Sequence, residues 1–347
     1  MGYVAVRGGE RAILQAEAFF RWLNGKPGME FLRQLEVHLP YLLDRVMGEG
    51  SLYAPELAAQ AIAQTGGDLY EAVLLLRAYR TTQPRLAYAE PLTPEAMLTV
   101  RRISAAFKDI PGGQVLGPSL DYSHRVLQPE EPPKAPAGPP AALHFPRVAD
   151  WHRLTGLLPI APPDPTPPSA IPDLTREPLL FPAPRAHRLQ ALSRADSGGV
   201  LALGYADMRG YSGAGGTHPT VNEVRLAYAE VRLRHPTTGA VFSAGRVRYS
   251  QAEVVTKFKE VNGKPGLELG FAATLGWNEV KLIAAAMLDA AMNRPDGHPA
   301  HQEEFVLMHT EPVEASGFCI HYKLPHYVTF GSDLDALRRA RSEEAVE

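Results

Sequence analysis

The chain has 347 residues, of which 45% are hydrophobic and 21% are charged, and its 35 basic and 38 acidic side chains give a formal net charge of −3. This is the composition of a globular protein, with enough length for about two domains. No stretch approaches the roughly 18 uncharged apolar residues of a membrane-spanning helix, the N-terminus has no signal-peptide pattern, and no basic run favours nucleic acid. A single cysteine, Cys319, excludes an intramolecular disulfide and a zinc site built from several thiolates. We therefore expect a cytoplasmic protein with no membrane insertion and no nucleic-acid partner.

The chain contains 32 prolines, and 17 of them lie within residues 129–184. Each proline removes a backbone hydrogen-bond donor, fixes φ and disfavours helix at the residue before it. Residues 129–185 are therefore predicted to form an extended connector between a first domain, residues 1–128, and a last domain, residues 186–347. The connector either lies along other surfaces or is a flexible linker. Its best candidate for packing is the short apolar stretch 148–160.

Helical signals dominate before the connector. Apolar residues recur at helical spacing, Pro40 interrupts the second run, and Asp68 followed by Glu71 three residues later is a capping-box pattern. Helices are predicted at residues 9–23, 29–47, 55–65, 68–79 and 93–107. The first domain is therefore predicted to be a helical layer.

After the connector the hydrophobic pattern changes to a period of two, which is typical of strands. Val224, Leu226 and Tyr228 alternate with charged or small residues. Strands are predicted at residues 200–205, 224–228, 241–255, 305–309 and 318–323, and helices at 277–292 and 332–341. Because no regular βαβ alternation is present, the predicted fold class is α+β, with a helical N-terminal layer, the extended connector, and a C-terminal mixed or antiparallel sheet with flanking helices.

A glycine- and proline-rich loop follows the helical layer. A GxxxxG spacing begins at Gly112, but Pro118 and Ser119 stand where a P-loop needs Lys and then Ser or Thr. Residues 108–125 nevertheless combine glycines, which allow close backbone approach to a ligand, with two carboxylates, one imidazole and several cations. The loop is predicted to be a ligand site, and the alternative is a structural turn with solvated charges.

Arginine makes up 27 of the 35 basic residues. Because the planar guanidinium group binds phosphate in a bidentate fork, arginines near the glycine loop are candidates for a polyphosphate cradle. These arginines are Arg77, Arg80, Arg101, Arg102 and Arg125. A coding bias toward arginine is the alternative explanation of the composition.

Two histidines, His321 and His326, lie five residues apart near the C-terminus. In a straight strand their side chains would point to opposite faces, about 17 Å apart. A shared metal therefore needs a bend, which Pro325 can supply. A half-site completed by ligands from elsewhere or from another chain is one interpretation, and two structural histidines are the other. Cys319 is either a thiolate ligand or a small buried apolar side chain.

Several long strings, spread over nearly the whole chain, carry a family resemblance. They are Tyr3–Glu10, Leu75–Thr82, Arg101–Ala105, Lys108–Gly117, Arg209–Tyr211, His218–Pro219, Glu303–Leu307 and Leu324–Val328. On these strings the chain resembles the I-subunit family of the bacterial carbon–phosphorus lyase core complex. The match fades in the proline-rich middle.

The resemblance implies an enzyme subunit of phosphonate degradation. In this family the subunit acts with the G, H and L proteins to displace adenine from ATP with a phosphonate, which gives α-D-ribose 1-phosphonate 5-triphosphate. Alone, it resembles a purine nucleosidase acting on ATP or GTP. The J subunit carries the iron–sulfur cluster, so none is expected on this chain. The I and J subunits share a zinc site whose two histidines correspond to His321 and His326, and two copies of the subunit are expected in each core complex.

Displacement at the anomeric carbon places chemical demands on three groups. The leaving purine needs a proton, the cationic sugar needs a negative charge, and the incoming phosphonate needs cations on the opposite face. Asp109 and Asp121 are our candidates for the first two tasks, with His124 as an alternative acid.

The groups that bind phosphate or phosphonate oxygens are predicted in the same part of the chain. Lys108, Arg102 and Arg125 supply the cations, and Gly112 and Gly113 supply backbone amides.

Two other classes of function stay open. The chain is then either a scaffold subunit that contributes part of a shared metal site, or a self-contained metallohydrolase, although the latter lacks a third ligand.

Overall fold

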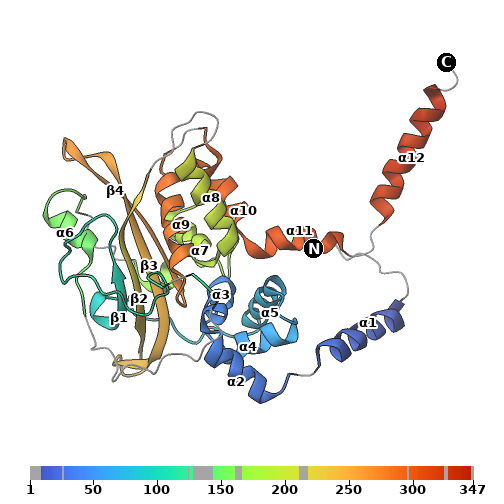
Figure 1. Ribbon diagram of the computed structural model, residues 1–347, viewed down its shortest axis with the longest axis horizontal. Helices are drawn as coiled ribbons and strands as arrows, with labels where there is room; N and C mark the ends of the chain where they lie inside the picture. The colour runs from blue at the N-terminus through green and yellow to red at the C-terminus, as the bar shows by residue number, and fades with distance from the viewer. Residues whose placement is uncertain are drawn as a thin grey trace.

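The computed structural model describes residues 9–25, 27–123, 125–127, 144–160, 166–210, 218–294, 297–323 and 327–344. One antiparallel sheet is combined with many helices, which confirms the predicted α+β class. Figure 1 shows the sheet with a group of helices along one side, a smaller helical group next to these, and outlying helices toward both ends of the chain.

Among the described residues, four strands form the sheet in the order β1-β2-β3-β4, and each neighbouring pair is antiparallel. They are β1 (Met97–Ile103), β2 (Thr220–Arg234), β3 (Val241–Val261) and β4 (Lys264–Leu275). Asn262 and Gly263, with φ of 53° and 75°, form the tight turn between β3 and β4, as an Asn-Gly hairpin predicts. Because β1 precedes the connector and pairs with β2, the first and last predicted domains share one sheet.

Helices cover one face of this sheet (Figure 1). They are α7 (Arg185–Arg194), α8 (Ser197–Arg209), α9 (Glu279–Ala291) and α10 (Glu303–His309). Val224 of β2 and Ala252 of β3 belong to the hydrophobic core on this side. Gly270 of β4 lets the alanine-rich α9 approach closely, because a Cβ there would lie 2.0 Å from the carbonyl oxygen of Ala286. The core between α9 and the sheet is therefore closely packed.

A second hydrophobic core lies within the helical layer. Its helices are α2 (Met29–His38), α3 (Pro40–Gly50), α4 (Pro55–Gln64) and α5 (Leu69–Thr81). Leu35 and Leu76 are buried in this core. Asp68 caps α5 by accepting hydrogen bonds from two backbone amides of the first turn, as the capping pattern predicted. Since α3 also contacts α7 and β4, the layer packs directly against the sheet and its helices.

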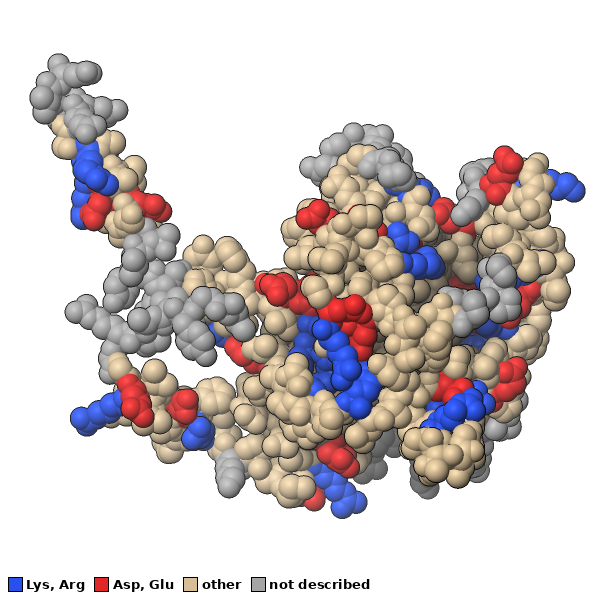
Figure 2. Space-filling model, turned by 180° about the vertical axis from the view of Figure 1, so that it is seen from behind, with Lys and Arg blue, Asp and Glu red and all other residues tan. Residues whose placement is uncertain are grey.

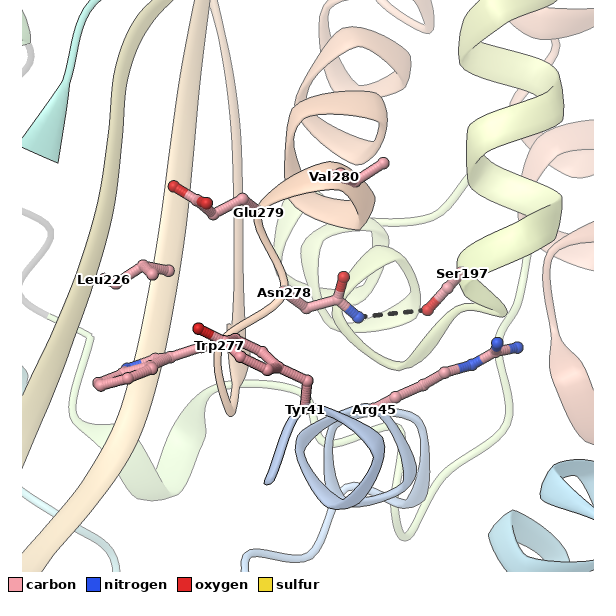
Figure 3. Close-up of a pocket in the computed structure, with 8 residues that line it drawn as sticks. All are labelled: Tyr41, Arg45, Ser197, Leu226, Trp277, Asn278, Glu279 and Val280. Atoms are coloured by element: carbon pink, nitrogen blue, oxygen red, sulfur yellow. Dashed lines mark hydrogen bonds between the residues drawn. The ribbon is translucent and has the colours of Figure 1, made fainter. Parts of the chain in front are cut away.

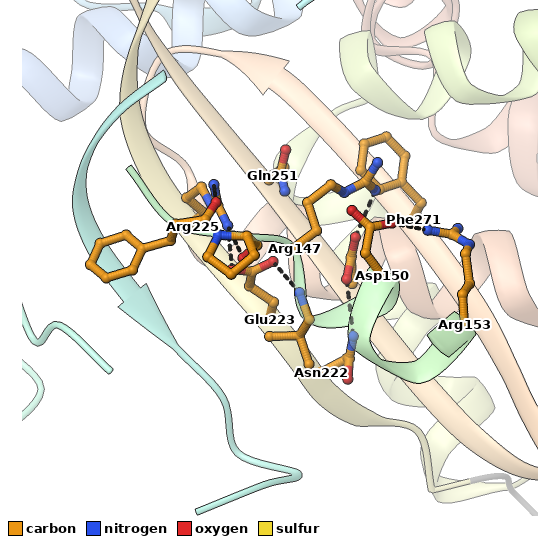
Figure 4. Close-up of polar contacts among 12 residues, drawn as sticks. Arg147, Asp150, Arg153, Asn222, Glu223, Arg225, Gln251 and Phe271 are labelled. Atoms are coloured by element: carbon orange, nitrogen blue, oxygen red, sulfur yellow. Dashed lines mark hydrogen bonds and ion pairs between the residues drawn. The ribbon is translucent and has the colours of Figure 1, made fainter. Parts of the chain in front are cut away.

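The opposite face of the sheet carries a buried polar network and a central part of the predicted connector (Figure 4). Helix α6 (Val148–Leu154) packs against β2 there. Arg102 and Arg225 both pair with Glu223, at 2.5 and 2.6 Å, and all three side chains are fully buried. Arg147, just before α6, pairs with a buried glutamate of β3. This part of the connector is thus fixed to the sheet by buried charges, and the predicted packing of the apolar stretch is confirmed.

Three helices extend away from the rest of the molecule (Figure 1). They are α1 (Gly9–Asn24), α11 (Pro312–Tyr322) and α12 (Tyr327–Glu344). No residue of α1 is buried, and its aromatic side chains Phe19 and Trp22 are 59% and 75% exposed. Phe318 of α11 and Phe330 of α12 are exposed as well. The rest of the described chain does not cover these apolar groups. No described helix combines the length and apolar character that a membrane span requires.

Several predicted elements had the wrong type. Residues 93–107 contain a 3₁₀ turn and β1 in place of a helix, because residues 97–103 pair with β2. Residues 200–205 lie inside α8, and the strands predicted at 305–309 and 318–323 are α10 and α11. Short apolar runs fit strands and buried helices equally well, so periodicity alone could not decide. The 3₁₀ helices are η1 (Pro94–Ala96), η2 (Pro168–Ala170) and η3 (Pro299–His301).

Candidate functional site

A cavity of about 360 Å³, here called the first cavity, lies where the helical layer meets the sheet. Figure 3 shows it between α3, the first turns of α8 and α9, and the sheet. The residues that line it are Tyr41, Arg45, Ser197, Leu226, Trp277, Asn278, Glu279 and Val280. Its volume lies in the range of small-molecule sites, roughly 300–1,000 Å³. Aromatic, cationic, hydroxyl, amide and carboxylate groups thus converge on one space.

Two aromatic side chains, Tyr41 and Trp277, contribute to this cavity. Trp277 is only 8% exposed, and its indole nitrogen donates a hydrogen bond to the carbonyl of Ala227 at 3.0 Å. The guanidinium group of Arg248 lies 4.7 Å from the centre of the Trp277 ring, which is a cation–π contact. The indole is therefore fixed in place in the wall of the cavity.

A hydrogen-bond network centred on Glu49 joins the helices around the cavity. Glu49 is buried, and its Oε1 accepts hydrogen bonds from Arg45 Nε at 3.0 Å and from the hydroxyl of Ser197 at 2.7 Å. Asn278 donates from Nδ2 to the Ser197 hydroxyl at 3.3 Å (Figure 3). Arg45 also donates to Asp196, the N-cap of α8, at 3.2 Å. The network holds α3, α8 and α9 in fixed relative positions.

A chain of charged groups begins at Glu279, which lines the cavity, and leads away through Arg101 to Asp121 and Arg125. Arg101 Nε donates to Oε1 of Glu279 at 2.6 Å, and a second nitrogen of Arg101 pairs with Asp121. Asp121 also accepts a hydrogen bond from the Ser119 hydroxyl at 2.6 Å and lies 3.4 Å from Arg125. The hydrogen bond from Ser119 holds the pKa of Asp121 below its usual value, and the charges of Arg101 and Arg125 add to this effect. Asp121 is therefore an ionised carboxylate at neutral pH, as a role beside a cationic sugar requires.

Two buried ionisable groups lie next to residues of the cavity. Burial lowers the pKa of Lys281 to about 8, in opposition to the charge of Glu49, and its Nζ donates to the carbonyl of Ser193 at 2.6 Å. Burial raises the pKa of Asp44, although Arg248 donates to its Oδ2 at 3.0 Å. In both groups desolvation shifts the pKa more than the neighbouring charges do. Shifted pKa values of this kind occur at functional sites and also in structural ion pairs.

The glycine loop predicted as a ligand site is anchored by Arg102. The NH1 nitrogen of Arg102 donates to the carbonyls of Pro111 and Gly113 at 2.8 and 2.7 Å, and NH2 donates to the carbonyl of Pro146 at 3.0 Å. Its Nε is bound to Glu223. The donors that the sequence suggested for phosphate are thus used within the protein, and Arg102 positions the loop.

The local structure also explains why two positions of this loop are glycines. Gly112 and Gly113 have φ of 84° and 77°, a region that favours glycine. A Cβ at Gly112 would lie 2.7 Å from the ring of Phe145, and the amide of Gly113 donates to the carbonyl of Ile110 at 2.9 Å. The loop backbone at Gly112 therefore lies close to another part of the protein's own chain. Phosphate binding by the two glycine amides stays a prediction.

The structure brings together only part of the predicted catalytic set. Asp121 lies against Arg101 and Arg125, and Arg101 in turn binds Glu279 of the first cavity. Lys108 and Asp109 are exposed on the loop and do not line this cavity. His124 lies outside the described residues.

The predicted metal histidines are likewise described in part. His321 is half-buried in the last turn of α11, and Cys319 is exposed on the same helix. His326 lies outside the described residues, so the pairing of the two histidines stays a prediction. The exposure of Cys319 corrects the expectation of a buried apolar side chain.

A different group of metal-ligating side chains is buried between α8 and η3. Asp207, His298 and His301 each offer a donor atom within 4.8 Å of the others. His301 Nε2 lies 2.7 Å from Asp207 Oδ1, and His298 Nδ1 accepts the amide of Ala300 at 3.1 Å. The same geometry suits a hydrogen-bonded cluster that ties the two elements together, because His298 Nδ1 already serves as a helix cap.

Sequence reasoning did not find most of the residues that line the first cavity. Asp196 followed by Ser197 and two glycines is a helix N-terminal signature, but residues 200–205 were interpreted as a strand. Trp277 and Glu279 were assigned only to a helix. Each of these residues gave only a local signal. No sequence pattern indicates that they converge on one cavity from distant elements.

The comparison with known proteins gives the family. Residues 2–344 match the family described as bacterial phosphonate metabolism protein (PhnI). The chain is 42% identical over 355 residues to the α-D-ribose 1-methylphosphonate 5-triphosphate synthase subunit PhnI of Rhizobium meliloti (strain 1021), covering 98% of this chain and 95% of the relative. It is 40% identical over 357 residues to the subunit of the same name from Escherichia coli (strain K12), covering 99% of each chain. The chain therefore belongs to the PhnI family of bacterial phosphonate metabolism proteins.

Proposed function

We propose that this chain is a subunit of an α-D-ribose 1-methylphosphonate 5-triphosphate synthase within a carbon–phosphorus lyase system. With partner subunits it transfers a phosphonate to C1′ of the ATP ribose. An oxygen of the phosphonate forms the new bond to C1′, while the bond from C1′ to N9 of adenine breaks. The purine leaves with that electron pair and takes up a proton. The names of the two relatives support this reaction class.

The observation that carries the proposal is the placement of Trp277 and Glu279 in one cavity at the start of α9. The flat indole suits a purine ring. A carboxylate two residues away suits the positive charge that develops on the sugar as the purine leaves. Arg101 holds Glu279 in place at 2.6 Å, and Asp121 adds a negative charge behind Arg101.

The remaining tasks need cations for the phosphate and phosphonate groups and an acid for the leaving adenine. Arg45 lines the first cavity and suits a phosphate of the nucleotide. Lys108 and Arg125 of the neighbouring loop are the predicted cations for the phosphonate. The proton for adenine is assigned to Asp109 or His124, which carries over the sequence-based prediction. Water in place of phosphonate would make the same cavity a purine nucleosidase on ATP or GTP when the chain is alone.

A zinc ion shared with a partner subunit is a further part of the proposal. His321 and His326 would hold it, and a zinc ion with ligands from two chains would fix their relative position. The half-buried ring of His321 fits a ligand that a second chain completes. Metal analysis of the assembled complex tests this point: zinc content should fall in the variants His321→Ala and His326→Ala, and stay unchanged in His235→Ala, which alters a surface turn. Full zinc content in both variants would contradict the shared site.

Assembly with other subunits is supported by the uncovered apolar side chains. Phe19 and Trp22 of α1 and Phe318 of α11 are exposed, and exposed apolar surface marks contact sites. We propose that the G, H, J and L proteins supply the covering surfaces, with two copies of this chain per core complex. A scaffold role without catalysis is the alternative, supported by the same exposed helices.

Adenine release from ATP separates the catalytic and the scaffold roles. The assembled complex with methylphosphonate should release adenine and form ribose 1-methylphosphonate 5-triphosphate, which ³¹P NMR detects. The chain alone should release adenine by hydrolysis. The same measurement on partners without this chain is the control. No adenine from any mixture that contains the intact chain would refute the catalytic role, and full activity without the chain would do the same.

A further inference from the structure

A second cavity, of about 450 Å³, lies on the other side of the segment that joins α7 to α8. Residues of α5, α7, α10 and α11 line it together with residues 174–179. Its polar lining consists of Arg77, Arg80, Thr81, Thr175, Glu177, Arg194, Glu311 and Glu314. The face of the molecule seen in Figure 2 has a dense group of basic side chains near its centre, next to acidic ones.

Two arginines of this cavity are held in place by the protein. Arg77 Nε donates to the carbonyl of Glu49 at 2.9 Å, and Arg77 NH2 donates to the carbonyl of Arg194 at 3.1 Å. Arg194 NH1 donates to the carbonyl of Leu174 at 2.9 Å. The Oε1 atom of Glu311 pairs with Arg77 and lies 3.7 Å from Arg194. One carboxylate oxygen therefore serves two guanidinium groups.

Hydrogen bonding of the arginines in this cavity is incomplete. The buried Nε atoms of Arg80 and Arg194 have no hydrogen-bond partner among the described residues. No ion pair joins Arg80 to a carboxylate in the described part of the chain. Burial and, second, the charge of the neighbouring Arg77 lower the pKa of Arg194 to about 10. The pKa of Arg80 is also lowered, first by burial and then by Arg77.

Three carboxylates line the cavity with the three arginines, but among the described residues Glu311 is the only one that pairs with any of these arginines. Glu311 uses its other oxygen, Oε2, to accept the amides of Val313 and Glu314 at 2.8 and 2.9 Å. Glu177 binds the amide of Asp173 and lies 3.5 Å from His187. Three guanidinium groups thus line one space, and among the described residues a single carboxylate oxygen, Oε1 of Glu311, pairs with them.

We propose that Arg77, Arg80 and Arg194 form a binding site for a tetrahedral oxyanion, a phosphate or phosphonate group. A guanidinium fork binds such oxygens in bidentate fashion, and a tetrahedral group can contact three forks at once, which a planar carboxylate cannot. The occupant is either a small free anion or the triphosphate end of a nucleotide. The site does not rest on the reaction proposed above, because anion binding is measured without turnover.

This site adjoins the first cavity through a shared wall. Arg194 lines the second cavity, while Asp196 binds Arg45 and Ser197 lines the first. Lys281 donates to the carbonyl of Ser193 in the same segment. An anion bound to Arg194 would therefore order the segment that supplies Ser197 to the first cavity.

Isothermal titration of the full chain with inorganic phosphate tests the site. Arg80→Ala should weaken phosphate binding about 10- to 100-fold, the effect of losing one charge-assisted contact. Thr81→Glu keeps all three arginines and adds a carboxylate at the cavity lining, so it should abolish phosphate binding. Arg234→Ala removes an exposed arginine that pairs with Glu90 and is the matched control.

Competition then identifies the source of the anion. If ATP displaces phosphate, and Arg80→Ala weakens both ligands, the site holds the triphosphate end of a nucleotide. If methylphosphonate displaces phosphate and ATP does not, the site holds a small free anion. Phosphate affinity that is unchanged in both Arg80→Ala and Thr81→Glu, or reduced equally in Arg234→Ala, would overturn the proposal.

Discussion

The Nε atom of Arg101 lies 2.6 Å from Oε1 of Glu279. This contact joins β1, which precedes the proline-rich connector, to the first turn of α9, which follows it. Arg101 also binds Asp121, so the glycine loop and the first cavity are parts of one charged chain. A carboxylate at the cavity is thus held by a buried arginine that is itself fixed from the other side, which is the rigidity that electrostatic catalysis needs.

Replacing Glu279 by glutamine tests this relationship. Glu279→Gln keeps the size of the side chain and removes the charge beside the sugar. We expect the rate of adenine release from ATP to fall about 10²–10³-fold, the usual effect of losing one preorganised electrostatic group. Glu90→Gln, which breaks the exposed pair with Arg234, is the matched control. A Glu279→Gln complex as active as the control variant would exclude Glu279 from the reaction.

Lys281 predicts a particular dependence of stability on pH. Its pKa in the folded protein is about 8, compared with an ordinary value of 10.5. Between these two pH values the folded state binds fewer protons than the unfolded state, so the free energy of unfolding rises with pH. The difference between the two pKa values corresponds to about 3 kcal/mol, which destabilises the folded state below pH 8 and is recovered as the pH rises through 10.5.

Urea unfolding of the full chain at pH 7.5 and pH 10 measures this effect. The difference in free energy of unfolding between the wild type and Lys281→Met should shift by about 2 kcal/mol in favour of the wild type at the higher pH. Lys264→Met changes an exposed lysine at the start of β4 and should show no such shift. A pH-independent difference for Lys281→Met would contradict the buried charge.

The helices that were predicted correctly are those with local signals. Pro40 divides α2 from α3, Pro55 begins α4, and Asp68 caps α5, and each of these effects acts within one turn. Residues 97–103 had no such signal. Their structure depends on pairing with β2 more than 100 residues later, so local propensity could not identify β1.

The candidate site was less predictable than the fold for the same reason. Asp121 and Arg125 were selected because they are close in sequence, and they are indeed close in space. Tyr41, Ser197 and Trp277 meet only because α3, α8 and α9 pack together. Sequence alone could identify charged loops, but a cavity built from three distant helices required the tertiary structure.

The buried triad of Arg102, Glu223 and Arg225 is expected to be important for stability. All three side chains are fully buried, and Glu223 is the carboxylate that both arginines share. Glu223→Gln leaves two buried guanidinium groups without their counter-charge, so we expect a loss of about 3–5 kcal/mol in the free energy of unfolding. Asp335→Asn, which breaks the exposed pair with Arg338 on α12, should change it by less than about 1 kcal/mol. Equal effects of the two variants in urea unfolding would show that the triad does not stabilise the fold.

Gly270 tests the close packing of α9 on the sheet. In Gly270→Ala the new Cβ would lie 2.0 Å from the carbonyl oxygen of Ala286 and 2.9 Å from the Cβ of Ala290. Because the nearest contact is backbone, α9 must move away from β4, and overpacking of this kind costs about 1–3 kcal/mol. Gly317→Ala on α11 meets nothing within 4 Å and should stabilise the chain by up to about 1 kcal/mol, since alanine favours helix. Opposite shifts of the two urea midpoints confirm this packing, and a neutral Gly270→Ala contradicts it.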